Sequence, residues 1–175
     1  MKYKLTNKKI DYLGRTLYQI EAVKKFGNIA KGQKGGFIEK KSNLSQDGNA
    51  WVYNYAMVYG NAKVYDCAKV SDDAKVYGDA WVYGDAKVHG NAEVYGNAEV
   101  HGDADYLVIG PIGSRNDRTT FFKTANNDIK VSCGCFTGTI EEFLEKVNET
   151  HGNNNYAKEY KTAVEIAKIH IFGGE

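Results

Sequence analysis

Residues 50–104 read AWVYNYAMVYGNAKVYDCAKVSDDAKVYGDAWVYGDAKVHGNAEVYGNAEVHGDA. Valine recurs at every sixth position, from Val52 to Val100, and an alanine stands two residues before each valine. Ala104 opens a tenth repeat. A period of six fits neither an amphipathic helix nor a long β-meander, so the stretch needs another kind of regular structure.

Each Ala-x-Val unit is predicted to be a short strand that directs alanine and valine to one face. The Gly-Asn or Gly-Asp pair that usually follows tolerates the left-handed backbone of a tight corner. Three such strands close a triangular coil of eighteen residues, and stacked coils hydrogen-bond at a spacing of about 4.8 Å. We therefore expect a parallel β-helix over residues 36–104, with a two-residue insertion before Ala50.

The unit Val-Tyr-Gly-Asn-Ala-Lys and its variants resemble the hexapeptide repeat of left-handed β-helix proteins. This resemblance implies left-handed coils and a homotrimer, and many members of the family are acyltransferases that bind coenzyme A between subunits. The Gly-Gly-Phe-Ile-Glu-Lys segment at 35–40 and the motifs Gly-Ser-Arg at 113–115 and Cys-Gly-Cys-Phe at 133–136 extend the likeness. With them, the whole chain resembles phage and prophage proteins of uncharacterised activity. That resemblance implies a phage accessory factor acting on a host component, with inhibition of host defence as one form.

The outward positions of the expected coils carry stacked aromatic side chains. Trp51 is expected on the first face, Tyr59, Tyr77 and Tyr95 on the second, and Tyr65, Tyr83 and Trp81 on the third. Rigid columns with polar tips suit an interface. Three interpretations stay open: stacking that stabilises the sheet, a trimer contact through the second face, and a ligand held between tyrosines.

The two flanks differ from the repeat. Residues 1–35 alternate in β fashion and predict a hairpin that caps the first coil, with Lys2 among lysines on a solvated surface or facing an acidic partner. Residues 105–175 predict strands at 106–109, 119–124 and 129–135 and helices at about 139–152 and 156–169. The expected fold is therefore mainly β: an N-terminal β cap (1–35), a left-handed β-helix (36–104) and a small β-β-β-α-α module (105–175).

No catalytic, metal or cofactor site is expected. His89 and His101 occupy ladder positions that tyrosine fills elsewhere, and the repeat has no inserted loop of the kind that hexapeptide acyltransferases use. We interpret both as substitutes for tyrosine, which leaves acyl transfer as an alternative function. Two histidines on different faces lack a third zinc ligand. Cys133 and Cys135 are too close for the usual metal spacing, so we expect them to be small buried side chains.

The segment Gly110–Arg115 is the best small-ligand candidate. Its backbone N–H groups and Arg115 could hold an anion, with Ser114, Arg118, Thr119 and Thr120 nearby. A plain turn is the alternative, because the lysine and helix start of a phosphate loop are missing. This hypothesis supports another function, the sequestration of a nucleotide-like small molecule.

The composition of the chain excludes some classes of function and location. The 175 residues carry 23 basic and 22 acidic side chains, a balance that argues against a dedicated nucleic-acid binder. The sequence shows neither a long apolar run nor a signal-type N-terminus, so we expect neither a membrane span nor export. Three cysteines, an odd number, suit a reducing cytosol. We expect a cytoplasmic, non-enzymatic binding protein that forms a homotrimer and binds a host protein or a small anionic ligand.

Overall fold

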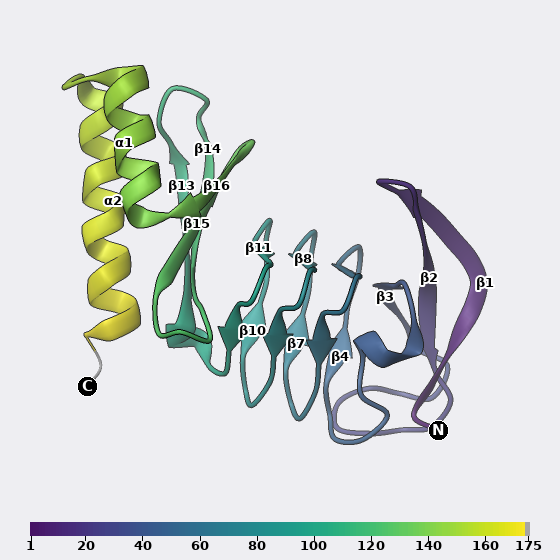
Figure 1. The fold of residues 1–175 in the computed structure, drawn as a ribbon. Coiled ribbons are helices and arrows are strands. Elements are labelled where there is room, and N and C mark those ends of the chain that lie inside the picture. Colours follow the sequence, from purple (N-terminus) through teal and green to yellow (C-terminus); the bar gives the residue numbers. More distant parts are fainter. Residues whose placement is uncertain (174–175) are drawn as a thin grey trace. The chain divides into compact units, whose positions relative to one another are not determined.

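The computed structural model describes residues 1–173, which are mainly β. They include a parallel β-solenoid of about four turns and a C-terminal helical module (Figure 1). The chain divides into two compact units, one from Met1 to Asp103 and one from Ala104 on. No helix among the described residues is long and apolar enough to cross a membrane.

Nine two-residue strands form the regular part of the solenoid. They are β4 (Trp51–Val52), β5 (Met57–Val58), β6 (Lys63–Val64), β7 (Lys69–Val70), β8 (Lys75–Val76), β9 (Trp81–Val82), β10 (Lys87–Val88), β11 (Glu93–Val94) and β12 (Glu99–Val100). They stack in three parallel columns, β5-β8-β11, β4-β7-β10 and β6-β9-β12. Every repeat valine from Val52 to Val100, and every repeat alanine from Ala50 to Ala98, is fully buried, which confirms the expected core.

The register follows the repeat. Lys63 pairs with Trp81, eighteen positions later, and the Lys63 N–H donates to the Ala80 carbonyl at 2.9 Å. At the start of the solenoid Ile38 pairs with Val58, twenty positions later, which confirms the two-residue insertion. The tenth repeat does not form: Ala104 is exposed in a short 3₁₀ helix, Asp103–Asp105. No valine follows it at the position where the other repeats bury one.

One residue at each corner has a left-handed backbone. The positive φ values recur every six residues, at Gly48, Asn54, Gly60, Asp66, Asp72, Gly78, Gly84, Gly90 and Gly96. Glycine, asparagine and aspartate adopt this conformation at the lowest cost, which explains the corner composition of the repeat. The corner residue therefore determines the turn. The valine that stands two residues before each corner, such as Val58 before Gly60, fills the interior.

The N-terminal hairpin continues one sheet of the solenoid. Strands β1 (Tyr3–Tyr12) and β2 (Arg15–Ala22) are antiparallel. Strand β3 (Lys34–Ile38) pairs with β2 antiparallel and with β5 parallel. The result is a six-stranded sheet in the order β1-β2-β3-β5-β8-β11. The hairpin therefore covers the edge at which an earlier coil would otherwise pair.

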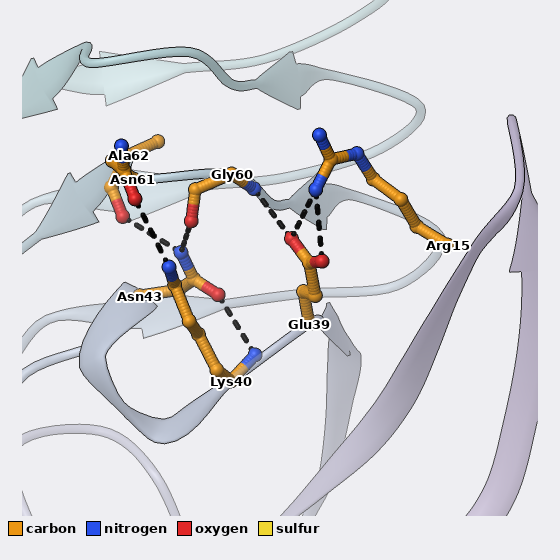
Figure 2. Close-up of polar contacts among 7 residues, drawn as sticks. All are labelled: Arg15, Glu39, Lys40, Asn43, Gly60, Asn61 and Ala62. Carbon is orange, nitrogen blue, oxygen red and sulfur yellow. Dashed lines mark hydrogen bonds and ion pairs between the residues drawn. The ribbon is translucent and has the colours of Figure 1, made fainter.

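Side chains satisfy the backbone at this first edge (Figure 2). The Asn43 amide donates to the carbonyls of Gly60 at 3.1 Å and Ala62 at 2.9 Å, in place of backbone N–H groups. The Glu39 carboxylate accepts the Gly60 N–H at 2.6 Å and the Arg15 guanidinium at 2.9 Å. Because Arg15 begins β2, this ion pair also ties the hairpin to the first corner.

Lys2 is buried, contrary to the expectation of a solvated lysine. Its ammonium donates to the carbonyls of Ala50 at 2.9 Å and Asp47 at 3.2 Å, and it lies 5.0 Å from the ring centre of Phe26. Burial lowers the pKa of Lys2 to about 8. Lys2 therefore supplies hydrogen-bond donors to other carbonyls at the N-terminal end of the solenoid.

The C-terminal module is an antiparallel sheet followed by two helices. Its elements are β13 (Tyr106–Ile112), β14 (Asp117–Lys123), β15 (Ile129–Cys133), β16 (Phe136–Thr139), α1 (Ile140–His151) and α2 (Asn155–Phe172). Strand β16 was not expected. It is short, and its last residue, Thr139, is also the N-cap of α1, where it forms the expected capping box with Glu142. Both helices pack their apolar faces on a core that includes Phe121 and Val131 (Figure 1).

We predict that Val76→Asp prevents the solenoid from folding. Val76 is fully buried at the middle of a column, and an unpaired carboxylate there costs several kcal/mol, a large part of the usual stability of a domain. Soluble yield and far-UV circular dichroism measure the effect. Asn91→Asp is the matched control, because it adds the same charge at an exposed corner. A Val76→Asp variant that melts like the wild type would contradict the expected core.

We predict that Asn43→Ala lowers the free energy of unfolding of the N-terminal unit by about 2–4 kcal/mol, because it leaves buried carbonyls without donors. Urea unfolding followed by tryptophan fluorescence measures this unit, since both tryptophans, Trp51 and Trp81, belong to it. Asn7→Ala, at an exposed position of β1, should change the same free energy by less than about 0.5 kcal/mol. Equal effects of the two substitutions would show that the Asn43 hydrogen bonds do not contribute to stability.

Candidate functional site

The second-face tyrosines stack, but the chain itself covers one end of their column. Ring centres lie 5.0 Å apart for Tyr59 and Tyr77, and 5.1 Å apart for Tyr77 and Tyr95. Tyr59 is only 6% exposed, because Leu17 packs on it and Tyr12 meets it edge-on at 5.8 Å. The expectation that Tyr59 is free for an interface is therefore wrong, since the hairpin occupies that part of the face.

Burial changes the ionisation of this column. It raises the pKa of Tyr59 to about 12 and raises that of Tyr77 as well, with smaller contributions from the neighbouring phenols and Glu93. Lys75 lies 5.6 Å from the ring centre of Tyr12 and forms an ion pair with Glu93 at 2.8 Å. The tyrosines therefore stay neutral over the physiological range and act as structural contacts between the hairpin and the solenoid.

Trp51 on the first face is also covered. Its side chain is fully buried, with the rings of Phe26 at 5.4 Å and Tyr3 at 6.2 Å, both edge-on. The expectation that it faces outward to solvent is wrong, because residues of the N-terminal cap pack over this end of the face. Two of the three faces thus lose their first aromatic residue to the cap.

The third face keeps its aromatic residues at the surface. We call Tyr65, Trp81 and Tyr83 the ladder face. Tyr65 and Tyr83 stack in parallel at 5.0 Å, and Trp81 meets Tyr65 edge-on at 6.2 Å. Trp81 is 41% exposed, and the Lys63 ammonium lies 5.0 Å from its ring centre. This face combines a rigid flat surface with an accessible indole, which are features of protein-binding surfaces.

The repeat histidines belong to the tyrosine columns. His101 lies edge-on to Tyr83 at 5.0 Å, and His89 is exposed on the first face. Among residues 1–173, no group of three or more histidine, cysteine, aspartate or glutamate side chains is arranged to hold a metal ion. The geometry around the two histidines is that of a stacked sheet surface.

The anion site expected near Gly110–Arg115 is not assembled as predicted. Thr119 and Thr120 are buried in β14, and the Thr119 hydroxyl donates to the Cys133 thiol at 3.3 Å. Residues 110–112 belong to β13, so the turn is shorter than expected and begins at Gly113. Arg118 is exposed on β14 and does not line the cavity beside the turn. Only Ser114 and Arg115 reach that cavity.

Helix α2 fixes the turn that carries Ser114 and Arg115. The Gly113 N–H donates to the Glu159 carboxylate at 2.6 Å. Gly113 has a φ of +71°, and a Cβ there would clash with the Tyr160 hydroxyl, so only glycine fits between the turn and the helix. Gly134, in the turn from β15 to β16, has a φ of +61° and lies directly beside the Arg115 guanidinium. The two turns therefore meet at Arg115.

A cavity of about 360 Å³ lies within the C-terminal module. We call it the module cavity, and its walls include Arg115, Phe136, Lys146, Val147, His151 and Tyr160. Phe143 joins Phe136 and Tyr160 through ring contacts of 5.3 and 5.4 Å, and His151 stacks on Tyr160 at 5.9 Å. Burial, with smaller contributions from Cys133 and Glu159, raises the pKa of Tyr160 to about 12, so its hydroxyl keeps its proton.

Sequence reasoning found only part of this cavity. Lys146 and His151 lie on α1, where a helical pattern marks them as ordinary surface residues, so no local signal points to a site. Cys135, expected to be buried, is exposed at the cavity, while Cys133 is half-buried. Cys67, Cys133 and Cys135 are all free thiols. Contacts between α1 and the two turns decide which residues meet there.

The chain matches no protein-family model, and no curated protein matches it either.

We predict that the N-terminal unit loses stability as the pH rises above about 10. Tyr59 and Tyr77 have a raised pKa in the folded state, so the unfolded chain releases their protons first and is favoured between about pH 10 and 12. Urea midpoints at pH 8 and 11, compared for wild type and the Tyr59→Phe/Tyr77→Phe variant, isolate this contribution. The variant should show a smaller loss. An identical loss in both proteins would contradict the assignment.

Proposed function

We propose that this protein is a non-enzymatic binding protein that uses the ladder face to contact its partner. The observation that carries the proposal is the exposure of Trp81 beside the stacked pair Tyr65 and Tyr83, on a surface that the protein's own cap leaves uncovered. Rigid aromatic side chains give a large contact area at a low entropic cost, and tryptophan and tyrosine are enriched among the residues that dominate binding energy.

The arrangement of the solenoid favours binding over acyl transfer. From β4 to β12 the strands recur every six residues without an inserted loop. A histidine base also requires an oriented partner and a pocket for the acceptor. His101 instead packs its ring edge-on against Tyr83, where it continues the column, and this contact supports a structural role.

We further propose the finer features that the sequence resemblances imply. The coils are left-handed with three hexapeptides each, and the protein is a homotrimer that acts in the bacterial cytosol. As a phage accessory factor, it binds a host component, and inhibition of host defence is the corresponding biological role. Three free thiols support a reducing compartment.

The ladder face can be tested with single substitutions. We predict that Trp81→Ala weakens the capture of host proteins from bacterial lysate by tenfold or more, because it removes a central aromatic contact. Quantitative mass spectrometry of the captured proteins measures this effect. Sedimentation velocity of the same proteins tests the proposed trimer, with about 58.5 kDa expected for three chains of 19.5 kDa.

Two control variants make this experiment decisive. Tyr55→Ala removes an aromatic residue that is 71% exposed but lies outside the ladder face, and it should leave both measurements unchanged. His89→Tyr/His101→Tyr restores the tyrosine pattern of the repeat and should also have no effect. If the histidine variant abolishes function together with acetyl-coenzyme A turnover, while Trp81→Ala is neutral, the protein is an acyltransferase and the proposal is wrong.

A further inference from the structure

Positive charge is concentrated around the module cavity. Residues 105–175 carry 8 lysines and arginines against 10 aspartates and glutamates, a net charge of −2. The cavity walls reverse this sign: Arg115 and Lys146 line the cavity, and none of its described lining residues is acidic. His151 adds a third nitrogen donor. Two carboxylates contact these elements: Glu159 accepts the Gly113 N–H at 2.6 Å, and Glu149 forms an exposed ion pair with the Lys146 ammonium at 3.0 Å. The cavity therefore favours an anionic ligand over a neutral or cationic one.

The remaining walls are aromatic and apolar. Phe136, Val147 and Tyr160 line the cavity, and the ring of Phe143 connects Phe136 to Tyr160. A volume of about 360 Å³ is near the lower end of the range for small-molecule sites, which runs from roughly 300 to 1,000 Å³. Flat walls of this kind suit a planar ring, and the size restricts the ligand to one ring system with one charged group.

The turn that carries the anion-binding arginine is held in place before binding. Arg115 lies in a turn that α2 fixes through Glu159 and Tyr160, and its guanidinium rests beside Gly134. A guanidinium in a defined position can donate two parallel hydrogen bonds to a carboxylate or phosphate. Lys146, on α1, also lines the cavity, and its exposed ion pair with Glu149 leaves the ammonium within reach of solvent and ligand.

We propose that the module cavity binds a small planar anion, an aromatic ring that carries one carboxylate or one phosphate group. The anion lies between Arg115 and Lys146, and the ring lies against Phe136, Val147 and Tyr160. This site is separate from the ladder face, which belongs to the other unit of the chain. Binding here therefore does not depend on the function proposed for the solenoid.

The 175-residue chain can be titrated with four probes. Phenyl phosphate and indole-3-acetate carry an aromatic ring with a phosphate or a carboxylate, while phenol and inorganic phosphate each supply one half of the first. Isothermal titration measures affinity, and ¹H–¹⁵N spectra locate the site. We expect at least one of the two complete anions to shift the amides of residues 133–136 and 146–151, and each half to bind at least tenfold more weakly. The complete anion that binds identifies the charged group.

Charge variants test the assignment of the site. Arg115→Ala should lower the affinity for the complete anion by tenfold or more. Arg118→Ala should leave this affinity unchanged, because Arg118 is exposed and does not line the cavity. Lys146→Glu, at an exposed position of α1, should also abolish binding without affecting folding, whereas Lys158→Glu on α2 should not. Trp81→Ala should bind the anion like the wild type, which separates this site from the ladder face.

The proposal is wrong if neither complete anion shifts those amides, or if phenol alone binds as tightly as phenyl phosphate. It is also wrong if Arg118→Ala and Lys158→Glu reduce the affinity as much as the cavity variants, because general charge would then explain the binding.

Discussion

Backbone hydrogen bonds from one coil to the next hold the solenoid together. In the regular repeat, from Trp51 on, these bonds link an N–H to the carbonyl seventeen residues later, as from Lys63 to Ala80. Because every coil must present the same pattern to its neighbours, each corner needs a left-handed residue at the same place, and each interior position needs a side chain of fixed size. The six-residue period, with its buried valine and alanine, follows from this constraint.

A stack of coils also has ends, where the same hydrogen bonds lack a partner. At the N-terminal end Asn43 and Lys2 donate to carbonyls that have no preceding coil to pair with, Glu39 accepts a corner N–H, and the β1–β2 hairpin continues one sheet. This closure also determines the outer surface. The cap that satisfies the edge packs over Trp51 and Tyr59, so the exposed aromatic surface is left on the third face.

The C-terminal module is organised differently. Its sheet and helices form a conventional core, and its ligand-sized cavity arises where two glycine-containing turns meet the helices. One unit thus has an exposed aromatic face, and the other has a partly open cavity whose lining includes Arg115 and Lys146. The two binding sites that we propose would allow a single chain to recognise two chemically different ligands.

The sequence by itself determined the elements that depend on local periodicity. The buried valines, the corner residues, the insertion before the regular repeat, and the helices with their capping box could all be predicted from spacing. It could not determine which outward residues remain exposed. Tyr59, Trp51 and Lys2 are buried by segments distant in sequence, Thr119 is buried in β14, and Arg115 and Lys146 both line the module cavity. Tertiary structure decided these positions, because burial and charge clustering depend on contacts between distant segments, which a repeating local pattern does not encode.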